Sequence, residues 1–177
     1  MAKPIWRSAS NRIFHLLARI GPGAISLRPF LHRLRGAQIG KNVFIGDDVY
    51  LENEYPECVE IQDGVQISIR ATILAHTRGP GKIIVERDAY IGPHVLVIAA
   101  GGKVLRIGEG AVISAGCVIA KDVPPRAFVS GEFGRPVAEA RVPLAKAEKM
   151  EDFIRGLRPI RPAKSAPKPQ TSADPST

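Results

Sequence analysis

Aliphatic residues recur at every sixth position through the middle of the chain. They form four sets of three: Ile39, Ile45, Leu51; Ile61, Ile67, Ile73; Val85, Ile91, Val97; and Ile107, Ile113, Ile119. The residue two before each of these twelve hexad positions is also small or aliphatic. Because residues two apart in a strand face the same side, each hexapeptide offers an inward pair and then turns. The repeat predicts a mainly β stack of about four triangular coils over residues 36–137.

The spacing between the sets predicts where loops leave the coils. Successive sets are 10, 12 and 10 residues apart, where an uninterrupted repeat would give six. The extra residues enter once per coil, so we expect three loops stacked at one corner, over residues 52–60, 74–84 and 98–106. Loops on a rigid scaffold are a common place for function. Glycine follows four hexad positions, where a tight bend is easiest: Gly40, Gly46, Gly92 and Gly108.

The two ends of the chain show a different pattern. Residues 5–20 predict an amphipathic helix with Ile13, Leu16, Leu17 and Ile20 on one face. A second short helix is expected over residues 24–35, so residues 1–35 form a basic helical N-terminal cap. A C-terminal helix is expected over residues 138–158. The remainder, residues 159–177, is rich in Pro, Lys, Ser and Ala and is expected to be disordered.

Charge is distributed unevenly along the chain. Residues 1–46 carry eight Lys or Arg and no acidic residue, whereas residues 47–137 carry nine basic and twelve acidic residues. Basic residues interleaved with aromatic residues are not found across the coils, which argues against a nucleic-acid partner. An anionic membrane near the N-terminus fits the charge better. The sequence shows neither an apolar run of about 20 residues nor a secretory signal pattern, so we expect a cytoplasmic protein.

Two segments carry a family resemblance. Residues 85–92 (VERDAYIG) and 107–125 (IGEGAVISAGCVIAKDVPP) resemble the hexapeptide-repeat acyltransferases, and the second resembles the closing signature of sugar and xenobiotic O-acetyltransferases. The resemblance covers residues 36–137. It implies a left-handed parallel β-helix, a homotrimer with sites between prisms, acetyl-coenzyme A as acyl donor, and a carbohydrate hydroxyl as acceptor. Acetylation of an amino sugar is the nearest alternative.

One of the four histidines has the position expected of a general base. A sugar hydroxyl is a poor nucleophile until a base removes its proton, and histidine is the side chain whose ordinary pKa lies nearest neutrality. His76 opens the middle loop and matches the catalytic histidine of the family. We expect His15 and His32 to serve packing in the N-terminal helices, and His94 to lie at the surface of a turn.

The remaining candidate site residues follow from the resemblance. The first loop, one coil before His76, is expected to hold the acceptor through Glu52, Asn53 or Glu54; Glu54 and Glu57 are also candidates for holding the second nitrogen of the histidine. A solvated acidic loop is an equally simple interpretation. For coenzyme A the resemblance implies Tyr90, Pro93, Ala115, Ala120, Lys121 and Arg135. Phe133 stands where the family has proline, so the adenine end of this site departs from the family pattern.

Rival functions were weighed on the same residues. A zinc enzyme on this fold needs three histidines, and the coils contain only His76 and His94, so no metal is expected. A serine hydrolase would need a Gly-x-Ser-x-Gly turn, which is absent from the sequence. A catalytically silent scaffold stays open. The N-terminal helix either caps the unpaired edge of the coils, which we favour, or contacts a membrane as a peripheral element.

Overall fold

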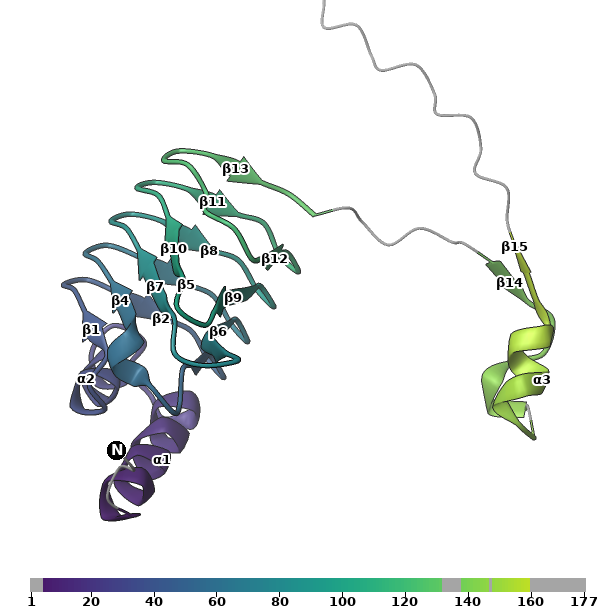
Figure 1. Cartoon of the computed structure of the whole chain (residues 1–177), viewed down its shortest axis with the longest axis horizontal. Coiled ribbons are helices and arrows are strands. Elements are labelled where there is room, and N and C mark those ends of the chain that lie inside the picture. The colour runs from purple at the N-terminus through teal and green to yellow at the C-terminus, as the bar shows by residue number, and fades with distance from the viewer. Residues whose placement is uncertain (1–4, 132–137, 147, 160–177) are drawn as a thin grey trace, which may run out of the picture. The chain divides into compact units, whose positions relative to one another are not determined.

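The computed structural model describes residues 5–131, 138–146 and 148–159. The chain divides into two units, Met1–Gly131 and Glu132–Thr177, which are described separately. The first unit is a solenoid of short parallel strands that begins with two helices, α1 (Ile5–Ile20) and α2 (Leu27–Leu34). Figure 1 shows the coils stacked on one another, with both helices at the N-terminal end of the stack.

Three parallel sheets form the sides of the solenoid. The first contains β1 (Gln38–Ile39), β4 (Val59–Ile61), β7 (Lys82–Val85) and β10 (Val104–Ile107). The second contains β2 (Phe44–Ile45), β5 (Gln66–Ile67), β8 (Tyr90–Ile91), β11 (Val112–Ile113) and β13 (Phe128–Val129). The third contains β3 (Tyr50–Leu51), β6 (Thr72–Thr77), β9 (Leu96–Ala100) and β12 (Val118–Ile119). The predicted mainly β stack of about four coils is confirmed.

The hexad positions form the core. All are buried except Ile39, which is half-buried, and every residue two before them is also buried. The register of the parallel strands places equivalent residues of neighbouring coils on top of one another. Ile45 pairs with Ile67, Ile67 with Ile91, and Ile91 with Ile113. Because apolar burial is the main favourable term in folding, this register specifies how each coil sits on the next.

The turns of the coils lie two residues after the glycines at which the sequence predicted them. A left-handed φ occurs at the third residue after most hexad positions, as at Asp48 (55°) and His94 (56°). The glycines that follow hexad positions have another purpose. A Cβ on Gly46 would lie 2.8 Å from the amide nitrogen of Ile69 in the next coil. These glycines therefore allow neighbouring coils to approach closely, rather than making the bend.

The three predicted loops leave the solenoid at one corner. Each follows a strand of the third sheet and precedes a strand of the first. The first loop contains a short 3₁₀ turn, η1 (Pro56–Cys58), whereas the second and third begin as extensions of β6 and β9. Leu74 pairs with Ile98 in these extensions. The middle and third loops are therefore held by sheet pairing at their base.

The first coil is closed by arginines of the N-terminal helices. Within the stack, the carbonyl of a hexad residue accepts the amide of a residue one coil earlier, as Ile67 accepts Gly46 at 2.8 Å. No earlier coil exists for the first three hexad residues. The guanidinium groups take that place: Arg33 donates to Ile39 (2.9 Å), Arg28 to Ile45 (3.1 Å) and Arg35 to Leu51 (3.2 Å). Each side of the triangular coil thus receives one arginine.

The helices also accept amides from the edge of the first coil. The amide of Ile45 donates to Ala24 at 2.9 Å, and that of Asp48 donates to Arg19 at 2.9 Å. Buried backbone groups that lack such partners cost free energy. The helices therefore lie across the otherwise unpaired strand edges of the first coil, as the capping hypothesis requires.

The second unit corrects one expectation. In place of a helix over residues 138–158, the structure has β14 (Ala138–Ala140), a 3₁₀ turn η2 (Leu144–Lys146), α3 (Met150–Arg155) and β15 (Leu157–Pro159). β14 and β15 pair antiparallel. Pro143 explains the break, because proline lacks an amide hydrogen and disfavours helix at the preceding residue. The expected disordered tail lies, beyond Pro159, outside the described residues.

Replacing Arg28 tests the arginine cap. Arg28 is nearly buried, and it donates to the carbonyls of Gly21 (2.7 Å) and Ile45 and pairs with Asp47. We expect Arg28→Met to lower the free energy of unfolding by about 2 kcal/mol, because buried carbonyls lose their donor. Arg33→Met is the matched control, since Arg33 is exposed and water can replace it. Equal losses in urea unfolding would contradict this account.

Candidate active site at the loop corner

His76 and Glu52 form a hydrogen-bonded pair at the corner where the loops emerge. His76 lies near the end of β6, with 29% of its side chain exposed, and its Nδ1 is 2.7 Å from the carboxylate of Glu52. Glu52 follows β3, one coil earlier. The ring of Tyr55 packs edge-on to the imidazole, with centroids 5.9 Å apart. The first and middle loops therefore meet at this histidine.

Glu52 is buried completely, and its partners keep it ionised. Its Oε1 accepts the amides of Glu54 (2.9 Å) and Tyr55 (3.1 Å), and its Oε2 accepts the amide of Ala75 (2.7 Å). Burial acts to raise the pKa of Glu52, but the hydrogen bonds from His76, Tyr55 and Ala75 outweigh it and hold the pKa below its ordinary value.

The pairing assigns the tautomer of His76. An ionised carboxylate can only accept hydrogen bonds, so Nδ1 carries the hydrogen that faces Glu52. In the neutral ring, Nε2 then has the lone pair and can accept a proton. A histidine held in this way by a carboxylate is the arrangement used for general-base chemistry.

This geometry changes the role expected for Glu52. We expected it to contact the acceptor, but all of its carboxylate bonds go to the chain and its side chain has no exposed surface. Glu52 therefore lies behind the histidine as its orienting group. Glu54 and Glu57 were the other candidates for a hydrogen bond to the second nitrogen of His76. The structure gives that bond, at Nδ1, to Glu52. Glu54 forms an ion pair with Arg12 at 3.7 Å.

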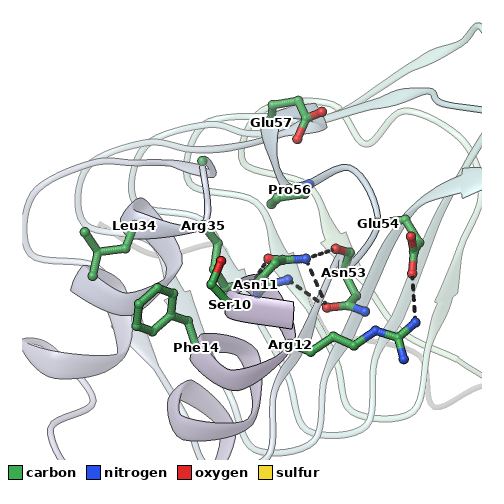
Figure 2. A pocket seen from close by; sticks show the side chains of 11 residues that line it. Ser10, Asn11, Arg12, Phe14, Leu34, Arg35, Asn53, Glu54, Pro56 and Glu57 are labelled. Carbon is green, nitrogen blue, oxygen red and sulfur yellow. Dashed lines mark hydrogen bonds and ion pairs between the residues drawn. The ribbon is translucent and has the colours of Figure 1, made fainter. Parts of the chain in front are cut away.

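Asn53 is held by the N-terminal helices. Its Oδ1 accepts His15 Nδ1 at 2.9 Å and Asn11 Nδ2 at 3.4 Å, and Asn11 also donates to its backbone carbonyl. Figure 2 shows Asn11 and Asn53 facing each other, with Arg35 beside them. The first loop is thus attached to α1 at the residue next to Glu52.

Arg35 connects the end cap to the site. Its Nη2 donates to the carbonyl of Glu52 at 2.6 Å, its Nε to Asn11 Oδ1 at 2.8 Å, and its Nη1 to His32 Nδ1 at 2.8 Å. Burial lowers the pKa of Arg35 to about 10, so it remains a cation at neutral pH. One guanidinium thereby fixes the backbone from which the Glu52 side chain extends.

Two histidines in this network are neutral. Burial, with the nearby charge of Arg35, lowers the pKa of His15 to about 4 and that of His32 to about 3. His32 Nδ1 accepts from Arg35, while the ring of His15 packs on Tyr50 with centroids 4.7 Å apart. Their expected packing role is confirmed. His94 is exposed, as expected.

A pocket lies beside the first loop, between it and the two N-terminal helices. It encloses about 180 Å³ and is bordered by the loop residues Asn53, Glu54, Pro56 and Glu57, with Arg12 among the helix residues opposite (Figure 2). Neither Glu52 nor His76 borders it. It brings the predicted acceptor residues Asn53 and Glu54 together on the side of the loop that faces the helices.

The residues expected at coenzyme A fall into separate groups. Pro93 and Ala115 lie at matching turns of adjacent coils, where Gly116 donates to Pro93 at 2.9 Å. Ala120 and Lys121 border a pocket of about 380 Å³ at the last coil. Tyr90 is exposed on the second sheet. Arg135 and Phe133 lie outside the described residues.

Sequence reasoning missed the polar network behind the loop. Asn11, His15 and Arg35 were not singled out as site residues, although Asn11, His15 and Ala18 recur at helical spacing and mark the inward face of α1. Among the described residues, no group of three His, Cys, Asp or Glu side chains is placed to hold a metal ion.

Comparison with known proteins identifies relatives that are named as acetyltransferases. No family model matches the chain. It is 31% identical over 135 residues to YvoF of Bacillus subtilis (strain 168), named as an acetyltransferase; the match covers 72% of this chain and 75% of that protein. It is 33% identical over 126 residues to the serine acetyltransferase of Mycobacterium tuberculosis (strain ATCC 25618 / H37Rv), covering 69% of this chain and 46% of the relative.

A solved structure gives a weaker comparison. The maltose O-acetyltransferase of Clostridium difficile 630 superposes with a TM-score of 0.45 and 16% identity, covering 68% of this chain and 77% of that one. The bifunctional protein GlmU of Acidovorax sp. (strain JS42) is 29% identical over 126 residues, and the match spans 61% of this chain but only 24% of the relative.

The two buried histidines predict a pH dependence of stability. Both are neutral when folded and gain a proton on unfolding below pH 6.5. Their contribution to stability is therefore complete above pH 6.5 and is lost as the pH falls toward about 4 for His15 and about 3 for His32. The loss approaches about 1.4 kcal/mol per pH unit for each. His32→Asn keeps an acceptor for Arg35 and should flatten the slope in urea unfolding between pH 7 and 5. His94→Asn, at an exposed turn, is the control; if it flattens the slope equally, the assignment is wrong.

Proposed function

The chain belongs to the hexapeptide-repeat acetyltransferases, and on that premise we propose that it transfers an acetyl group from acetyl-coenzyme A to a hydroxyl of a sugar or polysaccharide precursor. His76 acts as the general base, and no acyl-enzyme forms. The observation that carries the proposal is the bond between His76 Nδ1 and the ionised Glu52, because it leaves Nε2 to take the proton of the acceptor.

The transfer follows from this arrangement in one addition and one elimination. Nε2 of His76 takes the hydroxyl proton as the acceptor oxygen bonds to the thioester carbon, which gives a tetrahedral oxyanion and an imidazolium facing Glu52. The oxyanion then re-forms the carbonyl, the carbon–sulfur bond breaks, and the imidazolium returns its proton to the leaving sulfur. The products are an acetyl ester and the free thiol of coenzyme A.

The base favours a hydroxyl over an amine as acceptor. A hydroxyl at neutral pH attacks poorly without proton removal, whereas an uncharged amine already has a nucleophilic lone pair. A carboxylate that keeps the partly exposed His76 in the required tautomer suits an acceptor whose proton is difficult to remove. Asn53 and Glu54 border the pocket on the side of the first loop that faces the helices, and their polar groups are hydrogen-bonding partners of the kind that suits a carbohydrate.

The donor is assigned to the small and cationic residues farther along the coils. Pro93 and Ala115 place small side chains at matching turns of adjacent coils, which suits a thin pantetheine arm, and Lys121 offers an exposed cation for phosphate. Ala120 and Tyr90 complete the proposed contacts within the described residues. We further propose, from the family resemblance, that neighbouring copies in a homotrimer share the site.

Replacing His76 tests the base. We expect His76→Ala to lower kcat by about 10²–10⁴-fold with acetyl-coenzyme A and a panel of nucleotide sugars and oligosaccharides, because proton transfer from the acceptor is lost. His94→Asn, the other histidine of the coils, is the control and should keep the native rate. A His76→Ala protein that binds donor and retains the full rate would exclude His76 as the base.

Glu52→Gln separates orientation from proton transfer. The amide of Gln can still accept from Nδ1 but carries no charge to stabilise the imidazolium formed during proton transfer, so Glu52→Gln should lower kcat by about tenfold or more with little change in the KM for the donor. A purely structural role would reduce the amount of active protein without changing kcat per active site. Transfer to amino sugars alone would instead favour N-acetylation.

The proposed trimer has a direct measurement. Light scattering should give three times the chain mass of 19.1 kDa at micromolar concentration. Mixing the inactive His76→Ala protein with an inactive Lys121→Glu protein under dissociating and reassociating conditions should restore part of the activity if copies share a site. A monomeric mass with full activity would overturn this part of the proposal.

A further inference from the structure

The outer face of α1 is apolar. This helix turns Asn11, His15 and Ala18 toward the solenoid, and its opposite face is formed by Ile13, Leu16 and Ile20, whose exposed fractions are 58%, 56% and 70%. An amphipathic helix of a globular protein ordinarily buries its apolar side. Here the polar side is buried and the apolar side is exposed.

The second helix also exposes apolar side chains. α2 buries the polar residues Arg28 and His32 together with Pro29 and Leu31, and leaves Leu27, Phe30 and Leu34 exposed. The cap requires polar side chains on the inward side, because the carbonyls of the first coil need hydrogen-bond donors. That requirement does not explain an apolar outer side, for which ordinary polar residues would serve.

Together these residues define what we term the helical apolar surface. Its members are large aliphatic or aromatic residues exposed on α1, α2 and their connection: Ile13, Leu16, Leu17, Ile20, Ile25, Leu27, Phe30 and Leu34. α1 and α2 pack against each other. Soluble proteins rarely expose so many large apolar side chains in one region unless the region has a partner.

The charges around this surface are predominantly positive. Three acidic side chains of the first coil face the helices, and each pairs with an arginine there: Asp47 with Arg28, Asp48 with Arg19, and Glu54 with Arg12. Arg33 donates to neutral carbonyls, so its charge is not cancelled by those bonds. Since residues 1–46 contain eight Lys or Arg and no acidic residue, the segment that carries the surface keeps a net positive charge after these three ion pairs.

This combination identifies the occupant. Two copies meeting through the same surface would bring their positive charges together, which is unfavourable. An anionic lipid membrane satisfies both features, because its acyl chains accept the apolar side chains and its headgroups attract the cations. Among the described residues, no helix is long and apolar enough to cross a membrane, so the fitting geometry is a helix lying in the plane of the interface.

We propose that the helical apolar surface docks the protein on an anionic lipid membrane, with α1 and α2 lying in the headgroup region. The inference is independent of acetyl transfer, since it depends only on the exposed residues and the charge of the helices.

Vesicle co-sedimentation of the full chain tests the proposal. The vesicles are phosphatidylcholine alone, or phosphatidylcholine with about one third phosphatidylglycerol. We expect binding to the anionic vesicles to be at least about tenfold tighter than to neutral ones, and to weaken with added salt. The double variant Leu16→Gln/Ile20→Gln should lose at least about tenfold in partitioning, because apolar insertion contributes to the affinity.

A matched variant controls for general loss of surface hydrophobicity. Ile69→Gln/Val104→Gln removes two exposed aliphatic side chains from the coils and should bind vesicles as the native protein does. Circular dichroism checks that both variants are folded. The proposal is overturned if Leu16→Gln/Ile20→Gln binds like the native protein, or if anionic and neutral vesicles bind equally. It is also overturned if that variant changes only the mass in light scattering, which would assign the surface to contact between copies.

Discussion

The structure depends on how the open end of the solenoid satisfies its backbone. Parallel coils pair with the coil before and the coil after, so the first coil has carbonyls and amides that its own strands cannot pair. In a closed barrel this edge would not exist. Here Arg28, Arg33 and Arg35 of the helical region donate to one hexad carbonyl on each side of the triangle. The N-terminal helices therefore place polar side chains against the solenoid, where a helix on a sheet face would place apolar ones.

The arginine cap also contacts the candidate active site. Arg35 donates to the carbonyls of Leu51 and Glu52, the last residue of the first coil and the first residue of the first loop. The Glu52 side chain in turn accepts a hydrogen bond from His76. Two opposing effects meet at this carboxylate, because burial disfavours its charge and three backbone amides with the imidazole favour it. The hydrogen bonds prevail, and an ionised group behind the histidine is the result.

The hexad pattern could predict the core because strand alternation is local and repeated. His76 was predicted from its position after a hexad residue, at the start of the middle loop, and from the family resemblance. In the structure it lies on β6, which continues past Ile73 and buries Ala75. Glu52 was not predictable in this way. It follows Leu51 and would point outward by alternation, yet the chain leaves the coil there and folds the carboxylate beneath the loop. Alternation carries no information once the strand has ended.

The N-terminal helices show a second limit of periodicity. Helical spacing identified the face of Ile13, Leu16, Leu17 and Ile20, but periodicity gives only the two faces of a helix. Which face is buried depends on what the neighbouring surface needs. The end of a β-solenoid needs hydrogen-bond donors, and a sheet face would have needed apolar side chains. The prediction of one helix over residues 138–158 was wrong for a simpler reason. Pro143 interrupts a segment whose composition otherwise suits a helix.

α1 joins the two functional surfaces through a single rigid element. Its inner face holds Asn53 through Asn11 and His15, one residue from the carboxylate that orients His76. Its outer face presents Leu16 and Ile20 to the surroundings. Because opposite faces of one helix cannot move independently, any partner that fixes the outer face also fixes the inner contacts with the first loop. The end cap is thus the structural link between the proposed membrane surface and the proposed base, and its buried arginine network gives that link its stiffness.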